Sequence, residues 1–266
     1  LGELPGGTVL DGEVLAFKDG EPLPFSALQK RIGRKNLTDA VLEDVPVVFM
    51  AYDLLECGGR DLRALPTVER RERLEALLAD IPSEVLLPSP LVEVQSWEAL
   101  EMLHTQSRDR KVEGFMLKRK ASPYGTGRRK GDWWKWKVEP FTVDAVLLYA
   151  QAGRGRRATL YTDYTFAVWN GEALVPIAKA YSGLTDLEIV TLDKWIKANT
   201  RERFGPVRSV VPTHVFELGF EGIAESPRHK SGIALRFPRI LRWREDKPVE
   251  EADTLETLKA LLTLPV

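Results

Sequence analysis

Residues 129–140 read RKGDWWKWKVEP, and two lysines in this stretch, Lys135 and Lys137, are separated by one tryptophan. Successive side chains of a β-strand point to opposite faces, so both ammonium groups would share one face, with Trp134 and Trp136 on the other. Two neighbouring like charges are unfavourable unless an anion lies between them. Solvated lysines on an exposed edge strand are the alternative explanation of these residues alone. The spacing suggests an anion site. Other motifs of the sequence are needed to distinguish such a site from solvated lysines.

Two glutamates stand at the starts of other β-rich segments, where a charged side chain is unusual. Glu13 follows a glycine in LDGEVLAF, and Glu113 precedes one in VEGFMLK. Carboxylates at such positions could hold a ligand hydroxyl or a metal ion that prefers oxygen donors. Tyr52 lies in the otherwise aliphatic run FMAYDLL, where an aromatic ring could belong to the core or stack on a base. A structural role stays open for each residue taken singly.

Positive charge is concentrated in two parts of a chain whose formal net charge is only −1. Residues 118–137 hold eight Lys or Arg against one Asp, and residues 228–247 hold seven against one Glu and one Asp. Such clusters indicate a local anion-binding surface. Arg129 lies six residues before Lys135, and the two could contact one phosphate, with arginine as a forked donor and lysine as a point charge.

The bulk composition restricts the class of protein. A chain of 266 residues that is 44% hydrophobic and 29% charged can form one large or two modest domains. Cys57 is the one cysteine, which excludes an internal disulfide and a multi-cysteine zinc site. We find no run of about 18 apolar residues and no secretory signal, so a membrane span is not expected.

The elements that must position these residues can be predicted from periodicity and turn signals. The first part of the chain predicts a mixed α/β domain, with strands at 8–17, 45–55, 114–119 and 133–138 and helices at 25–33, 67–80 and 96–109. Ser96 is the expected N-cap of the last of these helices.

The pattern of apolar and polar residues changes near Pro140–Phe141, where the second part of the chain begins. Residues 141–174 alternate apolar and polar side chains between turn signals, and further strands are predicted at 213–226. A helix is predicted over 185–204, opened by Thr185 and Glu188 at capping-box spacing. Short strands with one inserted helix are typical of a small barrel such as an OB-fold, so the expected domains are 1–140 and 141–266.

The order of the motifs, DGE, YDLL, EGFMLK, WKWK, then RFPR with REDK, is similar to that of the ATP-dependent DNA ligases of the covalent nucleotidyltransferase superfamily. The resemblance extends from Leu10 to Lys247, and it is specific because five individually weak motifs occur in the right order. It implies an α+β protein, with a nucleotidyltransferase (ATP-grasp-like) mixed α/β domain followed by an OB-fold β-barrel.

The resemblance also implies a role for each matching residue. Glu13 would contact the ribose and assist a metal ion, Tyr52 would stack on adenine, and Glu113 would bind the metal. Four basic residues would surround the nucleotide phosphates, with the last two catalytic: Lys118, Arg129, Lys135 and Lys137. Four residues of the last motif would help to orient pyrophosphate: Arg236, Arg239, Asp246 and Lys247. On this reading the anion between Lys135 and Lys137 is a phosphate, and the tryptophans pack against the domain core.

The implied activity is the sealing of nicks in duplex DNA through enzyme–AMP and DNA–adenylate intermediates, with ATP and Mg²⁺ or Mn²⁺ as cofactors. The implied protein is an intracellular monomer that acts on nicked duplex DNA, in the cytoplasm (nucleoid) if prokaryotic, with no membrane partner. RNA ligases and mRNA-capping guanylyltransferases share the early motifs and form one alternative, whereas the RFPR and REDK ending favours DNA ligase. A non-catalytic OB-fold module that binds nucleic acid is another alternative.

One family motif does not occur in this sequence. The family nucleophile is a lysine in K-x-D-G, upstream of the DGE strand, where it forms a phosphoramidate with AMP. FKDGEP contains only a look-alike, because Lys18 adjoins Asp19 directly and follows the DGE strand in a predicted hairpin turn. We therefore expect the nucleophile to lie in an upstream segment that this chain lacks, so that the chain does not adenylylate itself.

Overall fold

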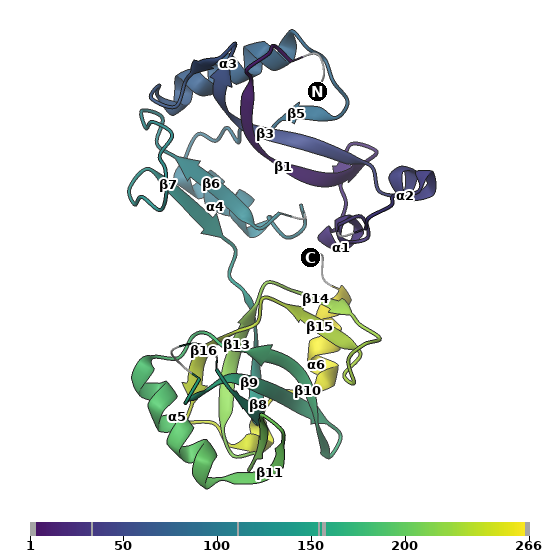
Figure 1. The fold of residues 1–266 in the computed structure, drawn as a ribbon, viewed down its shortest axis with the longest axis vertical. Coiled ribbons are helices and arrows are strands. Elements are labelled where there is room, and N and C mark those ends of the chain that lie inside the picture. Colours follow the sequence, from purple (N-terminus) through teal and green to yellow (C-terminus); the bar gives the residue numbers. More distant parts are fainter. Residues whose placement is uncertain (1–3, 33, 111, 154, 156–157, 264–266) are drawn as a thin grey trace. The chain divides into compact units, whose positions relative to one another are not determined.

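The structure is a computed structural model that describes residues 4–32, 34–110, 112–153, 155 and 158–263 (Figure 1). The chain forms two compact units, Leu1–Val138 (unit 1) and Glu139–Val266 (unit 2). Each unit buries its own set of apolar side chains. No helix in the described ranges is long and apolar enough to cross a membrane.

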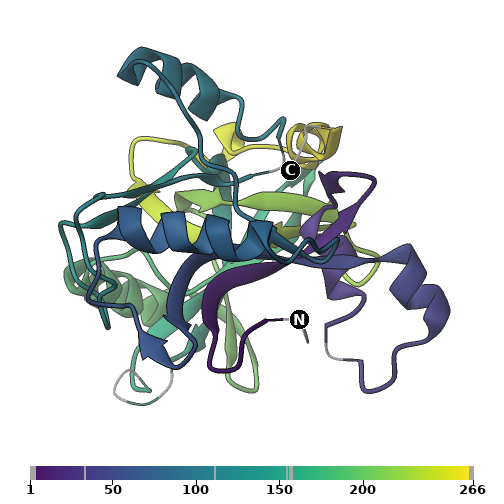
Figure 2. The ribbon, with the colours of Figure 1, turned by 90° about the horizontal axis from the view of Figure 1, so that it is seen from above.

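Unit 1 is built on a five-stranded sheet whose long central pair is antiparallel. Its strands are β1 (Val9–Lys18), β2 (Glu21–Pro22), β3 (Val47–Cys57), β4 (Arg60–Asp61) and β5 (Leu86–Pro88). The order is β2–β1–β3–β4, and β5 runs parallel to β3. Helix α3 (Thr67–Ala79) lies along this sheet in Figure 2, and its Leu74 and Leu78 pack with Ala51 and Leu54.

The WKWK segment belongs to a second, smaller sheet in unit 1. Strands β6 (Gly114–Lys118) and β7 (Trp133–Lys137) form an antiparallel pair that places Gly114 opposite Lys137. Gly114 has φ 125°, and a Cβ there would lie 2.1 Å from the carbonyl oxygen of Trp136. The glycine of EGFMLK is therefore required by the close approach of the two strands. The remaining helices of unit 1 are α1 (Phe25–Gln29), α2 (Asp39–Asp44) and α4 (Trp97–Thr105).

Unit 2 is a mainly antiparallel β structure with one long helix. Its elements in chain order are β8 (Phe141–Ala152), β9 (Tyr161–Asn170), β10 (Ala173–Ala180), α5 (Asp186–Ala198), β11 (Thr200–Phe204), β12 (Val207–Val210), β13 (Val215–Phe220), β14 (Gly222–Glu225), β15 (Ile233–Arg236), β16 (Arg239–Arg244) and α6 (Leu255–Ala260). Strand β8 pairs with β9, β12 and β13, and β13 also pairs with β16. A seven-stranded sheet thus encloses the larger apolar core, against which α5 packs.

Several predicted boundaries are wrong at their C-terminal ends. The helix predicted over 185–204 ends at Ala198, because residues 200–204 pair as β11 with β12. The helix predicted over 96–109 ends at Thr105, and the one predicted over 25–33 at Gln29, with Gly33 itself outside the described residues. The strands predicted at 213–226 are present as β13 and β14. The predicted caps are confirmed: Ser96 accepts from the Ala99 amide, and Thr185 with Glu188 forms a capping box.

Candidate functional site

The two faces of the β6–β7 hairpin differ in character. Strand alternation places Lys135, Lys137 and the start of β7, Trp133, on one face, and Trp134 and Trp136 on the other. Lys118, opposite Trp133, belongs to the lysine face, and its Nζ lies 4.1 Å from the centre of that ring. Three of the four predicted phosphate-binding cations therefore share one face of one hairpin, which is exposed at Lys135 and Lys137.

On the tryptophan face of β7, one of the two rings does not pack as predicted. Trp136 does pack against the unit, because its ring stacks on His104 of α4 with centroids 4.3 Å apart. Trp134 is 46% exposed, so the prediction that both indoles pack against the core is wrong for this residue. Among the ring contacts of the described residues, His104 of α4 stacks on Trp136, and none involves Trp134.

Glu113 and Lys137, predicted to bind metal and phosphate, form an ion pair with each other. The Lys137 Nζ lies 2.8 Å from Glu113 Oε2, with both side chains about half exposed. The carboxylate therefore offsets part of the like-charge repulsion between Lys135 and Lys137. An exposed pair of this kind contributes little stability and is easily rearranged around an entering phosphate.

Glu13 and Tyr52 form the second pair of predicted residues. The Tyr52 hydroxyl donates a 2.7 Å hydrogen bond to Glu13 Oε2, which connects β3 with β1. Burial, together with this bond to a carboxylate, raises the pKa of Tyr52, so the phenol stays protonated and can donate. Gly12 permits the close pairing of β1 with β3, because a Cβ there would clash with the Met50 carbonyl oxygen.

A further cluster of charged residues is buried and includes Lys118. Asp53, the residue after Tyr52, is 2% exposed and accepts two 2.8 Å hydrogen bonds from the guanidinium of Arg70 in α3. The Lys118 Nζ lies 3.9 Å from Asp53 Oδ2. Burial lowers the pKa of Lys118, and the nearby carboxylates of Asp53 and Asp11 offset part of this effect. Lys118 thus links the hairpin to the strand that carries Tyr52.

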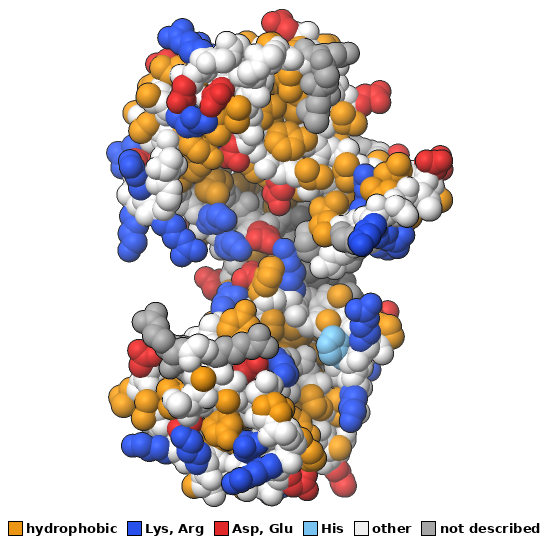
Figure 3. All heavy atoms as spheres, in the orientation of Figure 1, with side chains coloured by type: hydrophobic (Ala, Val, Ile, Leu, Met, Phe, Trp, Pro, Cys, Tyr) orange, Lys and Arg blue, Asp and Glu red, His pale blue; other side chains and the backbone are white. Residues whose placement is uncertain are grey.

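Arg129 lies at an exposed position of the β6–β7 loop, as do Lys120, Arg128 and Lys130. Figure 3 shows Lys and Arg side chains gathered over the part of unit 1 that carries this hairpin. The predicted joint contact of Arg129 and Lys135 with a phosphate remains a prediction.

The predicted residues of unit 2 lie in two groups at opposite ends of β16. Arg239 begins this strand and forms an ion pair of 2.8 Å with Glu221, while the Arg236 guanidinium lies 5.1 Å from the ring centre of Phe237. Asp246 and Lys247 follow the other end of the strand, about 16 Å of extended chain away. The joint contact of these four residues with a pyrophosphate remains a prediction.

The second group forms an ionic network that the sequence did not reveal. Asp144 of β8 accepts from Arg244 (2.9 Å) and Lys247 (2.7 Å), and Arg244 also pairs with Asp246 at 2.8 Å. The hydrogen bond from Arg244 lowers the pKa of Asp246 to about 2, and the same bond raises the pKa of Arg244. The REDK turn is thereby tied to β8.

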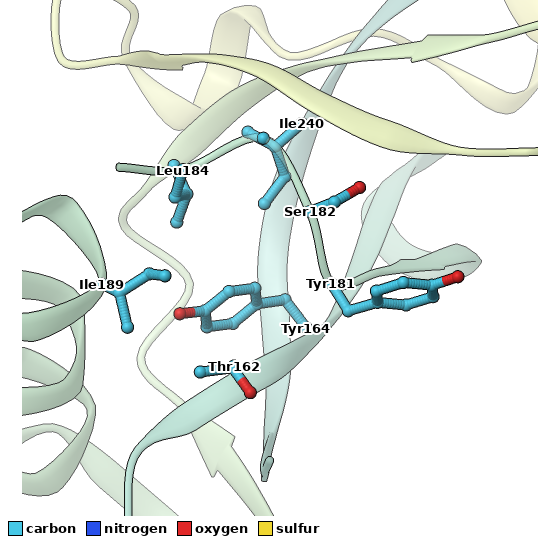
Figure 4. A pocket seen from close by; sticks show the side chains of 8 residues that line it. Thr162, Tyr164, Tyr181, Ser182, Leu184, Ile189 and Ile240 are labelled. Atoms are coloured by element: carbon cyan, nitrogen blue, oxygen red, sulfur yellow. The ribbon is translucent and has the colours of Figure 1, made fainter. Parts of the chain in front are cut away.

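A pocket of about 160 Å³ in unit 2 lies apart from the predicted residues (Figure 4). It is enclosed by β9, the segment after β10, α5 and β16, and its lining residues are Thr162, Tyr164, Tyr181, Ser182, Gly183, Leu184, Ile189 and Ile240. None of these side chains is charged, and none is among the predicted site residues.

Sequence reasoning missed Arg70, Asp53 and Asp144 as members of these clusters. Arg70 stands four residues before Leu74 on the apolar side of α3, and a charged residue within an apolar stripe is a signal of a buried ion pair. Asp144 gave no comparable signal, because its partners lie about a hundred residues away along the chain.

Comparison with known proteins identifies the class. Residues 3–137 match the family described as "ATP dependent DNA ligase domain", and residues 157–247 match "ATP dependent DNA ligase C terminal region". The first match covers half of the chain, and the chain therefore belongs to the ATP-dependent DNA ligase family. The order of motifs predicted the same family.

Individual relatives agree with this assignment. The chain is 42% identical to a "Probable DNA ligase" of Koribacter versatilis, over 93% of this chain and 47% of that protein, and 39% identical to a "DNA ligase" of Natronomonas pharaonis, over 95% and 45%. The chain thus spans about half the length of these curated relatives.

Two solved structures share the fold. One, named "Pmar-Lig_PreS3", has a TM-score of 0.66 at 18% identity. The match covers 89% of this chain and 51% of that chain. The other, described as "DNA binding with a minimal scaffold: Structure-function analysis of Lig E DNA ligases", has a TM-score of 0.61 at 21% identity, over 88% and 76%. The fold of the chain is that of DNA ligases.

Proposed function

We propose that this chain forms the nucleotide-binding and C-terminal parts of an enzyme that seals nicks in duplex DNA with ATP. Unit 1 serves as the nucleotidyltransferase (adenylation) domain, and unit 2 as an OB-fold domain. The observation that carries the proposal is the lysine face of β7, within a chain of this family, with Lys137 already paired to a carboxylate that a phosphate can displace.

The predicted residues of unit 1 bind different parts of the nucleotide. Tyr52 stacks on adenine, and Glu13, which it holds by a hydrogen bond, accepts from the ribose. Lys118, Lys135, Lys137 and Arg129 bind the phosphates and offset the charge that develops during transfer of AMP. In unit 2, four residues of the last motif help to orient pyrophosphate: Arg236, Arg239, Asp246 and Lys247.

The carboxylates present fit a small divalent cation. Mg²⁺ commonly binds one or two carboxylates and completes its shell with water and substrate phosphate. Among the described residues no group of three or more potential ligands is preassembled. Glu13 and Glu113 would therefore hold Mg²⁺ or Mn²⁺ together with the nucleotide. When bound, the ion neutralises phosphate charge.

The whole enzyme is proposed to act as a monomer on nicked duplex DNA inside the cell. RNA ligase and capping activities are not favoured by the relatives, which are named DNA ligases. A purely nucleic-acid-binding module would bind DNA without binding ATP.

Incubation of the chain with labelled ATP and a divalent metal tests the proposal. We expect saturable, reversible ATP binding and tighter binding to nicked than to intact duplex. We expect no covalent label, because Lys18 lies in the β1–β2 hairpin, paired with Glu21, rather than in a K-x-D-G motif. Stable label that disappears in Lys18→Ala would contradict the assignment of Lys18, and absence of ATP binding would contradict the proposed function.

A further inference from the structure

The proposed nucleotide site is divided between two sheets. Tyr52 and Glu13 lie on the five-stranded sheet, whereas Lys135 and Lys137 lie on the β6–β7 pair. No backbone ladder joins these two sheets among the described residues. Because a nucleotide must contact both, their spacing has to be fixed by contacts other than strand pairing. Backbone hydrogen bonds from α3 to the β6–β7 loop supply part of it, and side chains supply the rest.

Arg70 of α3 contacts both sides of this division. Its Nε and Nη2 donate to the two carboxylate oxygens of Asp53 on β3, at 2.8 Å each. Its Nη1 donates to the carbonyl oxygen of Ser122, in the β6–β7 loop, at 3.3 Å, and to that of Leu65. Nη2 also donates to Thr67 Oγ1 at 3.2 Å. The five hydrogen bonds match the five N–H donors of a guanidinium.

Ser122 carries this connection onward to the lysine strand. Its Oγ accepts from the indole Nε1 of Trp133 at 3.2 Å, and Trp133 stands two residues before Lys135 on β7. The backbone amide of Thr67 at the start of α3 donates to the Ser122 carbonyl oxygen at 2.8 Å. Ser122 is 2% exposed and Arg70 is 0% exposed, so water does not compete for these bonds.

We propose that Arg70 is a positioning residue that holds the Tyr52 strand and the Lys135–Lys137 hairpin at the spacing one nucleotide requires. The inference rests on the proposed function, since it assigns the two sheets to one ligand. Arg70 contacts Asp53, Ser122, Leu65 and Thr67, so it acts through them rather than on the nucleotide. Lysine cannot replace it, because an ammonium has three donors and no planar fork.

The test compares a ligand that bridges both sheets with ligands that use one. ATP would engage both, adenosine only the Tyr52 side, and tripolyphosphate only the lysine hairpin. In Arg70→Lys we expect ATP affinity to fall about tenfold or more, because the advantage of linking two subsites is lost when their spacing is wrong. Affinities for adenosine and tripolyphosphate, measured by NMR titration, should stay within about twofold of wild type. The matched control is Arg71→Lys, whose guanidinium contacts Glu75 and the Ser89 carbonyl oxygen instead.

The outcomes separate the alternatives. Equal ATP affinity in Arg70→Lys and wild type, or equal loss for all three ligands, would overturn the positioning role. Failure of wild type to bind ATP would instead overturn the proposed function. If Arg70→Lys does not fold by circular dichroism, Ser122→Ala tests the next contact of the same connection, because it removes the acceptor of Trp133 through which Arg70 and Ser122 would position β7. We expect Ser122→Ala to weaken ATP more than adenosine or tripolyphosphate, and an equal effect on all three would overturn the inference.

Discussion

Two neighbouring residues of β3, Tyr52 and Asp53, make hydrogen bonds in different environments. Tyr52 donates to exposed Glu13, whereas Asp53 turns to the buried Arg70. The Asp53–Arg70 pair is buried. Removal of one partner should therefore lower the free energy of unfolding by about 3–5 kcal/mol, because it leaves an unpaired buried charge. The Tyr52–Glu13 bond is accessible and can be altered with little effect on folding.

Tyr52 can therefore be tested at the level of the ring and the hydroxyl separately. Tyr52→Phe keeps the ring, and its ATP affinity should stay within about threefold of wild type, whereas Tyr52→Leu should lose about tenfold or more, since stacking contributes about 1–3 kcal/mol per base. Fluorescence or calorimetric titration measures both. Tripolyphosphate serves as the control ligand and should bind all three proteins equally. Equal ATP affinity in the Leu and Phe variants would remove Tyr52 from the adenine site.

At the scale of elements, the pairing of β6 with β7 depends on Gly114. Alanine there would combine an unfavourable φ of 125° with a Cβ 2.1 Å from a carbonyl oxygen. Gly114→Ala should destabilise unit 1 by at least about 2 kcal/mol in urea unfolding and weaken tripolyphosphate binding. Gly6→Ala is the control, because a Cβ at Gly6 meets nothing within 4 Å. Unchanged stability in Gly114→Ala would mean that the strands can separate at this point without cost.

A second element-level prediction concerns His214, at the entry to β13. Its ring lies between Trp195 of α5 and Trp243 of β16, and burial lowers its pKa below the ordinary value of 6.5. The unfolded chain then binds a proton at His214 more readily than the folded chain does. The contribution of His214 to the free energy of unfolding is therefore complete above pH 6.5 and decreases as the pH falls below this value. The loss is at most about 1.4 kcal/mol per pH unit.

Thermal unfolding of unit 2 between pH 7.5 and roughly 5, followed by near-ultraviolet circular dichroism, measures this dependence. His214→Phe should flatten the curve, whereas His229→Gln, at an exposed position, should leave it unchanged. A curve of the same slope in His214→Phe would assign the acid sensitivity to another group.

These elements also show what sequence could and could not predict. Helix α3 and the capping box of α5 depend on local patterns, and both were predicted closely. The overextended helix over 185–204 shows the limit, because only pairing with β12 makes residues 200–204 a strand. The Lys118–Asp53 contact joins positions 65 residues apart in sequence and has no local signal. The family motifs gave the candidate residues, whereas the side chains that hold them could be found only in three dimensions.

At the scale of the whole molecule, the two basic clusters are not equivalent. Much of the second is occupied by ion pairs, since Arg239, Arg242 and Lys247 pair with Glu221, Glu217 and Asp144. The first contains the exposed loop residues Arg128, Arg129 and Lys130. Cations already matched by a neighbouring carboxylate release fewer counterions from DNA, so the loop should carry more of the salt dependence.

The final prediction follows from this difference. Nick binding should weaken steeply with salt, and changing Arg128, Arg129 and Lys130 to Gln should reduce the slope of log K against log salt by up to about 2.7, or about 0.9 per lost phosphate contact. A control with the same change in net charge alters three exposed lysines of unit 2 to Gln: Lys179, Lys194 and Lys259. Its slope should stay close to that of wild type, because net charge alone does not create phosphate contacts. Fluorescence anisotropy of a nicked duplex at several salt concentrations gives both slopes. If the two variants lower the slope equally, the loop is not the DNA footprint and the effect is one of overall charge.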